Sequence, residues 1–159
     1  MNAFQRTFAV VSLGLTAIAT SAAADDMATV QTFYDLLSNP GSETHVAAFP
    51  GATSESWESV GNYSGENESR DEFVGQMGFF SQLIPDLDWS VQAMHQDGDF
   101  VTVRSRATGT PAGPFFGVDG EGRSFDILTI DIHELDDGVV VRTYHVEDWA
   151  SALQQLSGQ

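Results

Sequence analysis

The sequence predicts an α+β domain in which helices from the first half of the chain cover one face of an antiparallel sheet from the second half. Apolar residues recur at helical spacing as far as Ile84. After Pro85 the apolar period changes to that of strands with one buried face. Turn signals at Asp97-Gly98 and at 136–138 divide these strands into two hairpins. Helices followed by an antiparallel meander are typical of α+β domains.

The first residues, 1–24, have the composition of a cleavable export signal. One positive charge, Arg6, precedes the apolar run 8–19, and small residues follow at 21–24. The apolar run is too short for a membrane-spanning helix, which needs about 20 residues. We therefore expect cleavage after Ala24, export to the periplasm or the medium, and one domain over residues 25–159.

The chain is strongly acidic. Its 159 residues include 23 Asp and Glu against six Lys and Arg, all of them arginine, and the formal net charge is −17. Loss of Arg6 with the signal makes the mature net charge −18. Such a surface repels phosphate backbones and anionic lipid headgroups, so we expect neither nucleic-acid nor membrane binding. The chain has no Cys, which excludes disulfides, Cys-ligated zinc and a thiol nucleophile.

Two helices are predicted before residue 52. Residues 25–38 carry apolar side chains at positions 27, 30, 33, 34 and 37, behind two aspartates that favour a helix N-terminus. Pro40-Gly41 ends this helix, and a second short helix is expected over 42–49, with Pro50-Gly51 as its end. The stretch 52–68 is rich in Ser, Gly, Asn and Glu, and we expect a loop there with at most a short edge strand.

The remaining elements follow from a capping box and from strand alternation. The box Ser69-x-x-Glu72 begins a third helix, which Pro85 ends. The first hairpin turns Arg104 and Arg106 toward water. The rest is a Gly- and Pro-rich connection over 109–122, a second hairpin over 124–135 and 139–146, and a closing helix over 147–156.

The last hairpin carries the candidate chemistry. Asp131 and His133 lie on its first strand and His145 on its second, and a short turn pairs such strands antiparallel, which makes Asp131 and His145 cross-strand neighbours. Thr129 shares their face in an even register. If this face looks into a cavity under the helices, burial and mutual charge tune the carboxyl and imidazole groups toward proton transfer near neutral pH.

The opposite orientation of this hairpin is also compatible with the pattern. Leu128, Ile130 and Ile132 are apolar and can form the buried set instead. Asp131 and His145 are then a surface pair that contributes almost nothing to stability.

The other histidines do not suggest a metal site. His45 and His95 are expected at the surface. Asp131-x-His133 is the one ligand-like spacing on a convincing element, so we expect no metal and no cofactor.

An ordered set of short motifs occurs between residues 71 and 156. The motifs are Pro85-Asp86-Leu87, Asp97-Gly98-Asp99, Gly109-Thr110, Phe116-Gly117, Gly122-Arg123, Asp131-Ile132, Asp137-Gly138, Asp148 and Leu153-Gln154-Gln155-Leu156. In this order and spacing they resemble the SnoaL-like polyketide cyclase (ester cyclase) family of the nuclear transport factor 2-like superfamily. The resemblance implies a cone-shaped fold, in which a curved antiparallel sheet wraps on N-terminal helices around a deep apolar pocket. It also implies acid/base chemistry without a cofactor on ketone- or ester-bearing substrates.

The resemblance implies roles for two residues. In characterised cyclases an Asp on the last strand removes a substrate proton, and a His on the preceding strand assists. Aligned backward from the shared C-terminal motif, the Asp position falls on His145 and the His position on Asp131. This exchange, together with the export signal, favours a reaction other than intracellular polyketide cyclisation.

Three functions are compatible with these features of the sequence. The first is a lyase, isomerase or hydrolase that uses His145 as general base, oriented by Asp131, on a small hydrophobic carbonyl or ester compound. Thr129 and His133 would share its pocket. The candidate aromatic walls are Trp57, Tyr63, Phe79, Phe80, Trp89 and Phe116. The alternative is a non-catalytic carrier or sensor that holds a small hydrophobic ligand in the same pocket. The third is a scaffold that forms a homodimer through the exposed face of the sheet.

Overall fold

The computed structural model describes residues 16–158, with side chains from residue 25 onward. The helices of this part are α1 (Thr16–Ser38), α2 (Glu43–Ala52), α3 (Arg70–Leu83) and α4 (Trp149–Ser157). The strands are β1 (Thr53–Val60), β2 (Glu68–Ser69), β3 (Asp88–Asp97), β4 (Phe100–Gly109), β5 (Phe125–Asp136) and β6 (Val139–Glu147). The predicted α+β class is confirmed.

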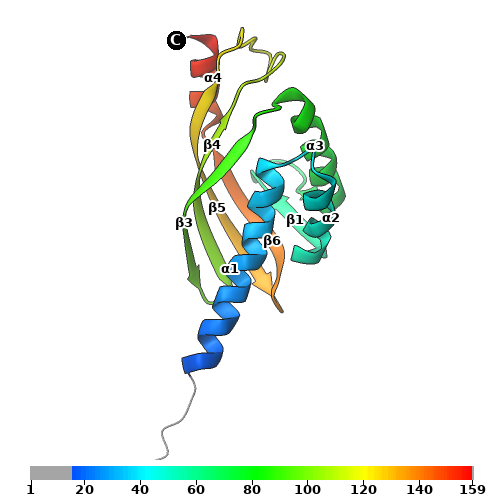
Figure 1. Ribbon diagram of the computed structural model, residues 1–159, viewed down its shortest axis with the longest axis vertical. Helices are drawn as coiled ribbons and strands as arrows, with labels where there is room; N and C mark the ends of the chain where they lie inside the picture. Colours follow the sequence, from blue (N-terminus) through cyan, green and yellow to red (C-terminus); the bar gives the residue numbers. More distant parts are fainter. Residues whose placement is uncertain (1–15, 159) are drawn as a thin grey trace, which may run out of the picture.

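The described strands form one mixed sheet in the order β2-β1-β6-β5-β4-β3. All neighbouring pairs are antiparallel except β1 and β6, which run parallel. Figure 1 shows α1 crossing one face of the sheet, with α2 and α3 beside it near β1, and α4 at the end of the sheet where the chain finishes. Because the helices lie on one side, the sheet has an inner face that is covered and an outer face that is open.

The helices are held to the sheet by a cluster of aromatic rings. Phe33, Phe49, Trp57 and Phe73 come from α1, α2, β1 and α3 respectively. Their ring centroids lie 5.2 to 6.1 Å apart. Such pairs stabilise a fold by about 0.5–1.5 kcal/mol each beyond the burial of apolar area. One cluster therefore fixes four elements from the first half of the chain.

The prediction that Pro50-Gly51 ends the second helix is wrong. α2 continues to Ala52, with Pro50 inside its last turn. Proline removes one backbone donor there. The burial of Phe49 and Ala52 outweighs that loss, and the hydroxyl of Thr53 donates to the carbonyl of Phe49 at 2.9 Å. The backbone then passes directly into β1.

The prediction of a loop over 52–68 is wrong for its first half, which forms the eight-residue strand β1. β1 is an interior strand, paired with β2 on one side and β6 on the other. Most of its residues are polar, so its sequence lacks the apolar alternation of a strand. Trp57, Ser59 and Val60 are nevertheless buried. Tertiary pairing, and not local preference, determines this strand.

The third helix begins as predicted. Ser69 is its N-cap, and both halves of the capping box with Glu72 are present. The two hairpins are also confirmed, with Arg104 and Arg106 exposed on β4. The closing helix begins two residues later than expected, because Asp148 caps it and accepts from the backbone N–H of Ser151. Glu147 is consequently the last residue of β6.

The last hairpin turns the face that carries Asp131 toward the helices, which is the first of the two predicted orientations. Along β5, Ile127, Thr129, Asp131, His133 and Leu135 face inward and are buried. The alternate positions face outward, where Leu128 is 52 % and Ile132 38 % exposed. The predicted homodimer through this outer face stays a prediction.

The predicted export signal falls mainly on residues 1–15, which lie outside the described residues. Its remaining residues belong to α1, which runs without interruption past Ala24. The first turns of α1 project beyond the end of the sheet (Figure 1). Within the described part of the chain, no helix combines the length and the apolar character that crossing a membrane requires.

Candidate functional site

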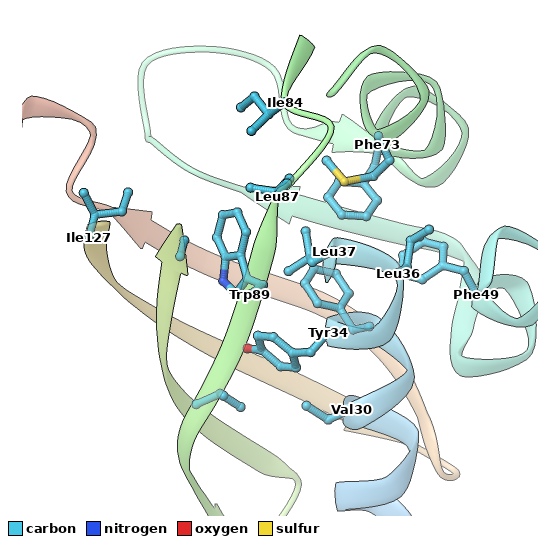
Figure 2. Close-up of a cluster of buried hydrophobic side chains, with 14 of the residues drawn as sticks. Val30, Tyr34, Leu36, Leu37, Phe49, Phe73, Ile84, Leu87, Trp89 and Ile127 are labelled. Carbon is cyan, nitrogen blue, oxygen red and sulfur yellow. The ribbon is translucent and has the colours of Figure 1, made fainter. Parts of the chain in front are cut away.

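A cavity of about 170 Å³ lies between α1, α3 and the inner face of the sheet. Its apolar wall consists of Phe33, Leu37, Phe73, Met77, Phe80, Trp89, Phe116 and Trp149. Its polar lining consists of Ser59, Glu68, Gln76, Asp131, His145 and Glu147. Figure 2 shows Leu37 and Tyr34 extending from α1, with Trp89 facing them from β3. An apolar hollow with a few convergent polar groups is the usual form of a small-molecule site.

Five of the residues proposed from the sequence line this cavity, and five do not. Asp131, His145, Phe80, Trp89 and Phe116 line it.

The others require correction as pocket walls. Tyr63 is 94 % exposed and borders a hollow on the outer face of the sheet. Phe79 points outward as well, with 60 % exposure. Trp57, Thr129 and His133 are inward but fully buried below the cavity, where they make hydrogen bonds that position other groups.

His145 is held at both ring nitrogens. Its Nδ1 lies 2.7 Å from Oε1 of Glu147, and its Nε2 lies 3.0 Å from Oγ of Ser59. Because a carboxylate can only accept, Nδ1 carries the proton of the neutral ring. Nε2 is then the free base, and the hydroxyl of Ser59 donates to it. This tautomer is inferred from the hydrogen bonds.

Three carboxyl groups surround this imidazole. Burial acts to lower the pKa of His145, but the hydrogen bond and charge of Glu147, with the charges of Asp131 and Glu68, outweigh it and raise the pKa above its ordinary value. Burial also raises the pKa of the Glu68 carboxyl, against the opposing charge of His145. Across residues 16–158, no group of three His, Cys, Asp or Glu side chains is arranged to hold a metal ion.

Asp131 lies directly opposite His145 in the β5–β6 ladder, as the sequence predicted. The prediction that Asp131 orients this ring is not supported by the hydrogen bonds, because Glu147 and not Asp131 contacts the ring. Oδ2 of Asp131 accepts from the hydroxyl of Tyr34 at 2.7 Å. Asp131 is only 2 % exposed, and this burial raises the pKa of its carboxyl to about 7, although the bond from Tyr34 acts in the opposite direction.

A buried chain of hydrogen bonds holds Asp131 in place. The indole N–H of Trp57 donates to Oγ1 of Thr143 at 3.1 Å, and that oxygen lies 3.0 Å from Nδ1 of His133. Nε2 of His133 lies 2.9 Å from the hydroxyl of Tyr34. Every donor finds an acceptor if His133 is neutral with its proton on Nε2. Burial lowers the pKa of His133 to about 3, which agrees with a neutral ring.

Sequence reasoning missed Tyr34, Ser59, Glu68 and Glu147. Glu147 follows His145 by two residues, so strand alternation alone would have placed it on the same face. Ser59 and Glu68 lie in the stretch predicted as a loop. Nothing local identifies Tyr34, because its spacing on α1 is that of an ordinary core residue.

Gly61 leaves the space that the imidazole of His145 occupies. A Cβ at this position would lie 2.9 Å from both Cε1 and Nε2 of the ring. Gly61→Ala is therefore expected to move the ring away from Glu147 and to return the pKa of His145 toward its ordinary value, with little change in thermal stability. An NMR titration of the histidine signals measures this.

The matched control is Gly65→Ala in the same loop. There a Cβ would meet only Oδ1 of Asn62, at an ordinary 3.7 Å. An unchanged pKa of His145 in Gly61→Ala would mean that the ring is not confined at this point.

Comparisons with known proteins place the chain in a family. The model of the SnoaL-like polyketide cyclases matches residues 28–156. A candidate SnoaL-like polyketide cyclase from Jannaschia sp. CCS1 has 21 % identity and a TM-score of 0.73, covering 86 % of this chain and 94 % of that one. IdmH, a candidate polyketide cyclase from Streptomyces antibioticus, has 23 % identity and a TM-score of 0.70, covering 82 % and 97 %. No curated protein sequence matches the chain.

A third solved structure extends the likeness beyond the cyclases. It is a protein from Catenulispora acidiphila DSM 44928 with a ketosteroid isomerase-like fold, solved with trimethylamine, at 15 % identity and a TM-score of 0.65, covering 82 % of this chain and 92 % of that one. These likenesses confirm the predicted cone-shaped, nuclear transport factor 2-like fold. The family match spans both the helices and the sheet that build the cavity, and the chain belongs to the SnoaL-like polyketide cyclase family.

Proposed function

We propose that this protein is an exported enzyme that performs acid/base chemistry, without a cofactor, on a small hydrophobic carbonyl or ester compound. Membership of the SnoaL-like family supports small-molecule chemistry of this kind in general. The observation that carries the proposal is the pair of His145 and Glu147 in a cavity with an apolar wall, with the buried Asp131 opposite.

The site contains both a base and an acid. Nε2 of neutral His145 can remove a proton from the carbon next to a substrate carbonyl. Asp131 is protonated below about pH 7 and can then donate to the oxygen on which negative charge develops. Because His145 must be neutral and Asp131 protonated, the rate is expected to peak in a narrow range near neutral pH.

The size of the cavity limits the substrate. An apolar protein cavity of about 150 Å³ holds a molecule such as benzene. The cavity here, about 170 Å³, therefore suits a compact compound of about one or two small rings. Drug-sized ligands usually occupy about 300–1,000 Å³. We infer a smaller substrate than a polycyclic polyketide.

Export of this enzyme is part of the proposal. The support is the signal-like composition of residues 1–24 and the acidity of the remaining chain. Mass spectrometry of the protein recovered outside the cytoplasm is expected to find Asp25 at the N-terminus. A chain that keeps Met1 and stays in the cytoplasm would contradict export.

Deuterium exchange into 1-indanone tests the proposed chemistry. This compact aromatic ketone has protons next to its carbonyl, and NMR in D₂O follows their replacement. Wild-type protein is expected to accelerate the exchange, and His145→Ala to abolish the acceleration while keeping its fold by circular dichroism. If 1-indanone raises the thermal stability of the protein without any exchange, the protein is a carrier and the proposal fails.

A further inference from the structure

We propose that Ser59, His145 and Glu147 form a catalytic triad that hydrolyses compact esters through an acyl group carried on Ser59. This inference rests on the proposed function for the cavity and for His145 as the base. It adds the nucleophile, the orienting carboxylate and the class of reaction.

The three side chains have the connectivity of an activated serine. Oγ of Ser59 lies 3.0 Å from Nε2 of His145, and Nδ1 of the same ring lies 2.7 Å from Glu147. Nucleophile, base and orienting acid are thus joined in order by two short hydrogen bonds, which is the geometry by which such triads are recognised on unrelated folds. All three residues line the same cavity.

The sheet fixes this arrangement. Ser59 lies on β1 and the other two residues on the parallel neighbour β6, where Ser59 pairs with Thr143. Ser59 is only 6 % exposed and lines the cavity. Its hydroxyl is therefore open to a substrate in the cavity and is largely shielded from bulk solvent. The hydroxyl of Ser56 on the same strand lies instead 3.4 Å from that of Ser54, at the exposed surface. Burial beside an imidazole distinguishes Ser59 from its neighbours.

The reaction balances with water as the only co-reactant. Oγ of Ser59 attacks the ester carbonyl carbon while its proton passes to Nε2 of His145. The intermediate collapses, the bond to the alcohol oxygen breaks, and His145 returns the proton to that oxygen. Water then attacks the acyl group with the same base, which releases a carboxylic acid and restores Ser59.

The other lining groups suit this chemistry. Gln76 and Trp149, which line the cavity, carry the kind of neutral N–H donor that the oxygen of a tetrahedral intermediate requires. The charge of Glu147 gives the cavity negative potential, which repels an anionic product more than a neutral ester. Hydrolysis of an ester therefore converts a ligand that the site accepts into one that it expels.

Two probes test the triad. The first is hydrolysis of 4-nitrophenyl acetate, in which Ser59→Ala is expected to lower kcat/KM by about 10³-fold or more. The second is diisopropyl fluorophosphate, which loses fluoride as a serine oxygen bonds to its phosphorus. Mass spectrometry is expected to find this adduct on Ser59. Ser56→Ala, on the same strand, is the matched control and should keep both the rate and the adduct.

Exchange of 1-indanone separates the two proposals. It needs His145 as the base and no nucleophile, so it is measured on the wild-type protein beside the ester assay. If Ser59→Ala hydrolyses the ester at the wild-type rate, or the adduct lies on another residue, the triad is overturned. If exchange persists in that case, acid/base chemistry by His145 stands. If wild-type protein shows neither exchange nor ester hydrolysis, both proposals fail.

Discussion

Asp131→Asn is expected to make the protein more stable than wild type at pH 8, by about 4 kcal/mol, and to change its stability little at pH 4. The reason is the burial of Asp131, which raises the pKa of the carboxyl from 3.8 to about 7. Each unit of pKa shift corresponds to about 1.4 kcal/mol of stability. Asparagine keeps the shape and an acceptor for Tyr34 but carries no charge.

The direction with pH follows from proton binding. Between pH 3.8 and about 7 the native protein holds a proton on Asp131 that the unfolded chain has released. The stabilisation is complete below the unfolded pKa and is lost as the pH rises through the folded pKa. Asparagine does not titrate, so the variant gains on wild type over this range. Chemical unfolding at pH 4, 6 and 8 measures the gain.

Asp126→Asn is the matched control on the same strand. Asp126 is exposed, and its ion pair with Arg106 lowers the pKa of its carboxyl. This variant should show no gain at pH 8. If Asp131→Asn and wild type differ in unfolding free energy by the same amount at all three pH values, ionisation of Asp131 does not destabilise the fold. Replacing a functional residue often makes a protein more stable, because such residues are kept for activity at a cost in stability.

His133 acts in the opposite direction to Asp131. Burial lowers the pKa of His133 to about 3 in the native protein. The unfolded chain binds a proton on this ring below the ordinary pKa of about 6.5, whereas the native protein does not. This contribution to stability is lost as the pH falls from about 6.5 to 3. Between about pH 4 and 6.5 the two slopes oppose each other. The shared hydroxyl of Tyr34 thus links two groups whose effects on the pH dependence of stability oppose each other over this range.

The parts of the fold that the sequence predicted are those with strong local signals. The capping box of Ser69 and Glu72 fixed the start of α3, and alternation with turn residues fixed both hairpins and the pairing of Asp131 with His145. The orientation of the last hairpin was open, because Ile130 and its neighbours on the outer face are as apolar as a buried set. Only packing under α1 decides which face is covered.

The site was less predictable, because most of it is assembled by tertiary contacts. Ser59 lies on a strand with polar composition that exists through its pairing with β6. Tyr34 comes from α1 and meets Asp131 across 97 residues of sequence. Trp57 was expected as a pocket wall, and it is instead the buried donor that begins the chain of hydrogen bonds to Asp131. Local patterns identify candidate groups, whereas their partners depend on the three-dimensional fold.

Glu147→Gln is expected to lower the rate of proton transfer by His145 by about 10²–10⁴-fold. Two effects combine. Loss of the charge and of the charged hydrogen bond lowers the pKa of His145, which Glu147 now helps to raise. The amide of glutamine can also donate to Nδ1, which moves the ring proton to Nε2 and leaves no free base facing the cavity. A carboxylate-to-amide change beside a catalytic histidine costs about 10⁴-fold in a well-studied serine protease.

Histidine NMR titrations and 1-indanone exchange, measured on the same samples, separate the two effects. If only the charge matters, the rate profile of Glu147→Gln moves to lower pH together with the lowered pKa of His145, and most of the rate is kept. If the tautomer matters, the rate stays low at every pH. Glu134→Gln, which removes a carboxylate paired with Arg142 in the same hairpin, is the control. It should change neither the pKa of His145 nor the rate of 1-indanone exchange. An unchanged pKa and rate in Glu147→Gln would remove Glu147 from the site and return the orienting role to Asp131, its cross-strand neighbour.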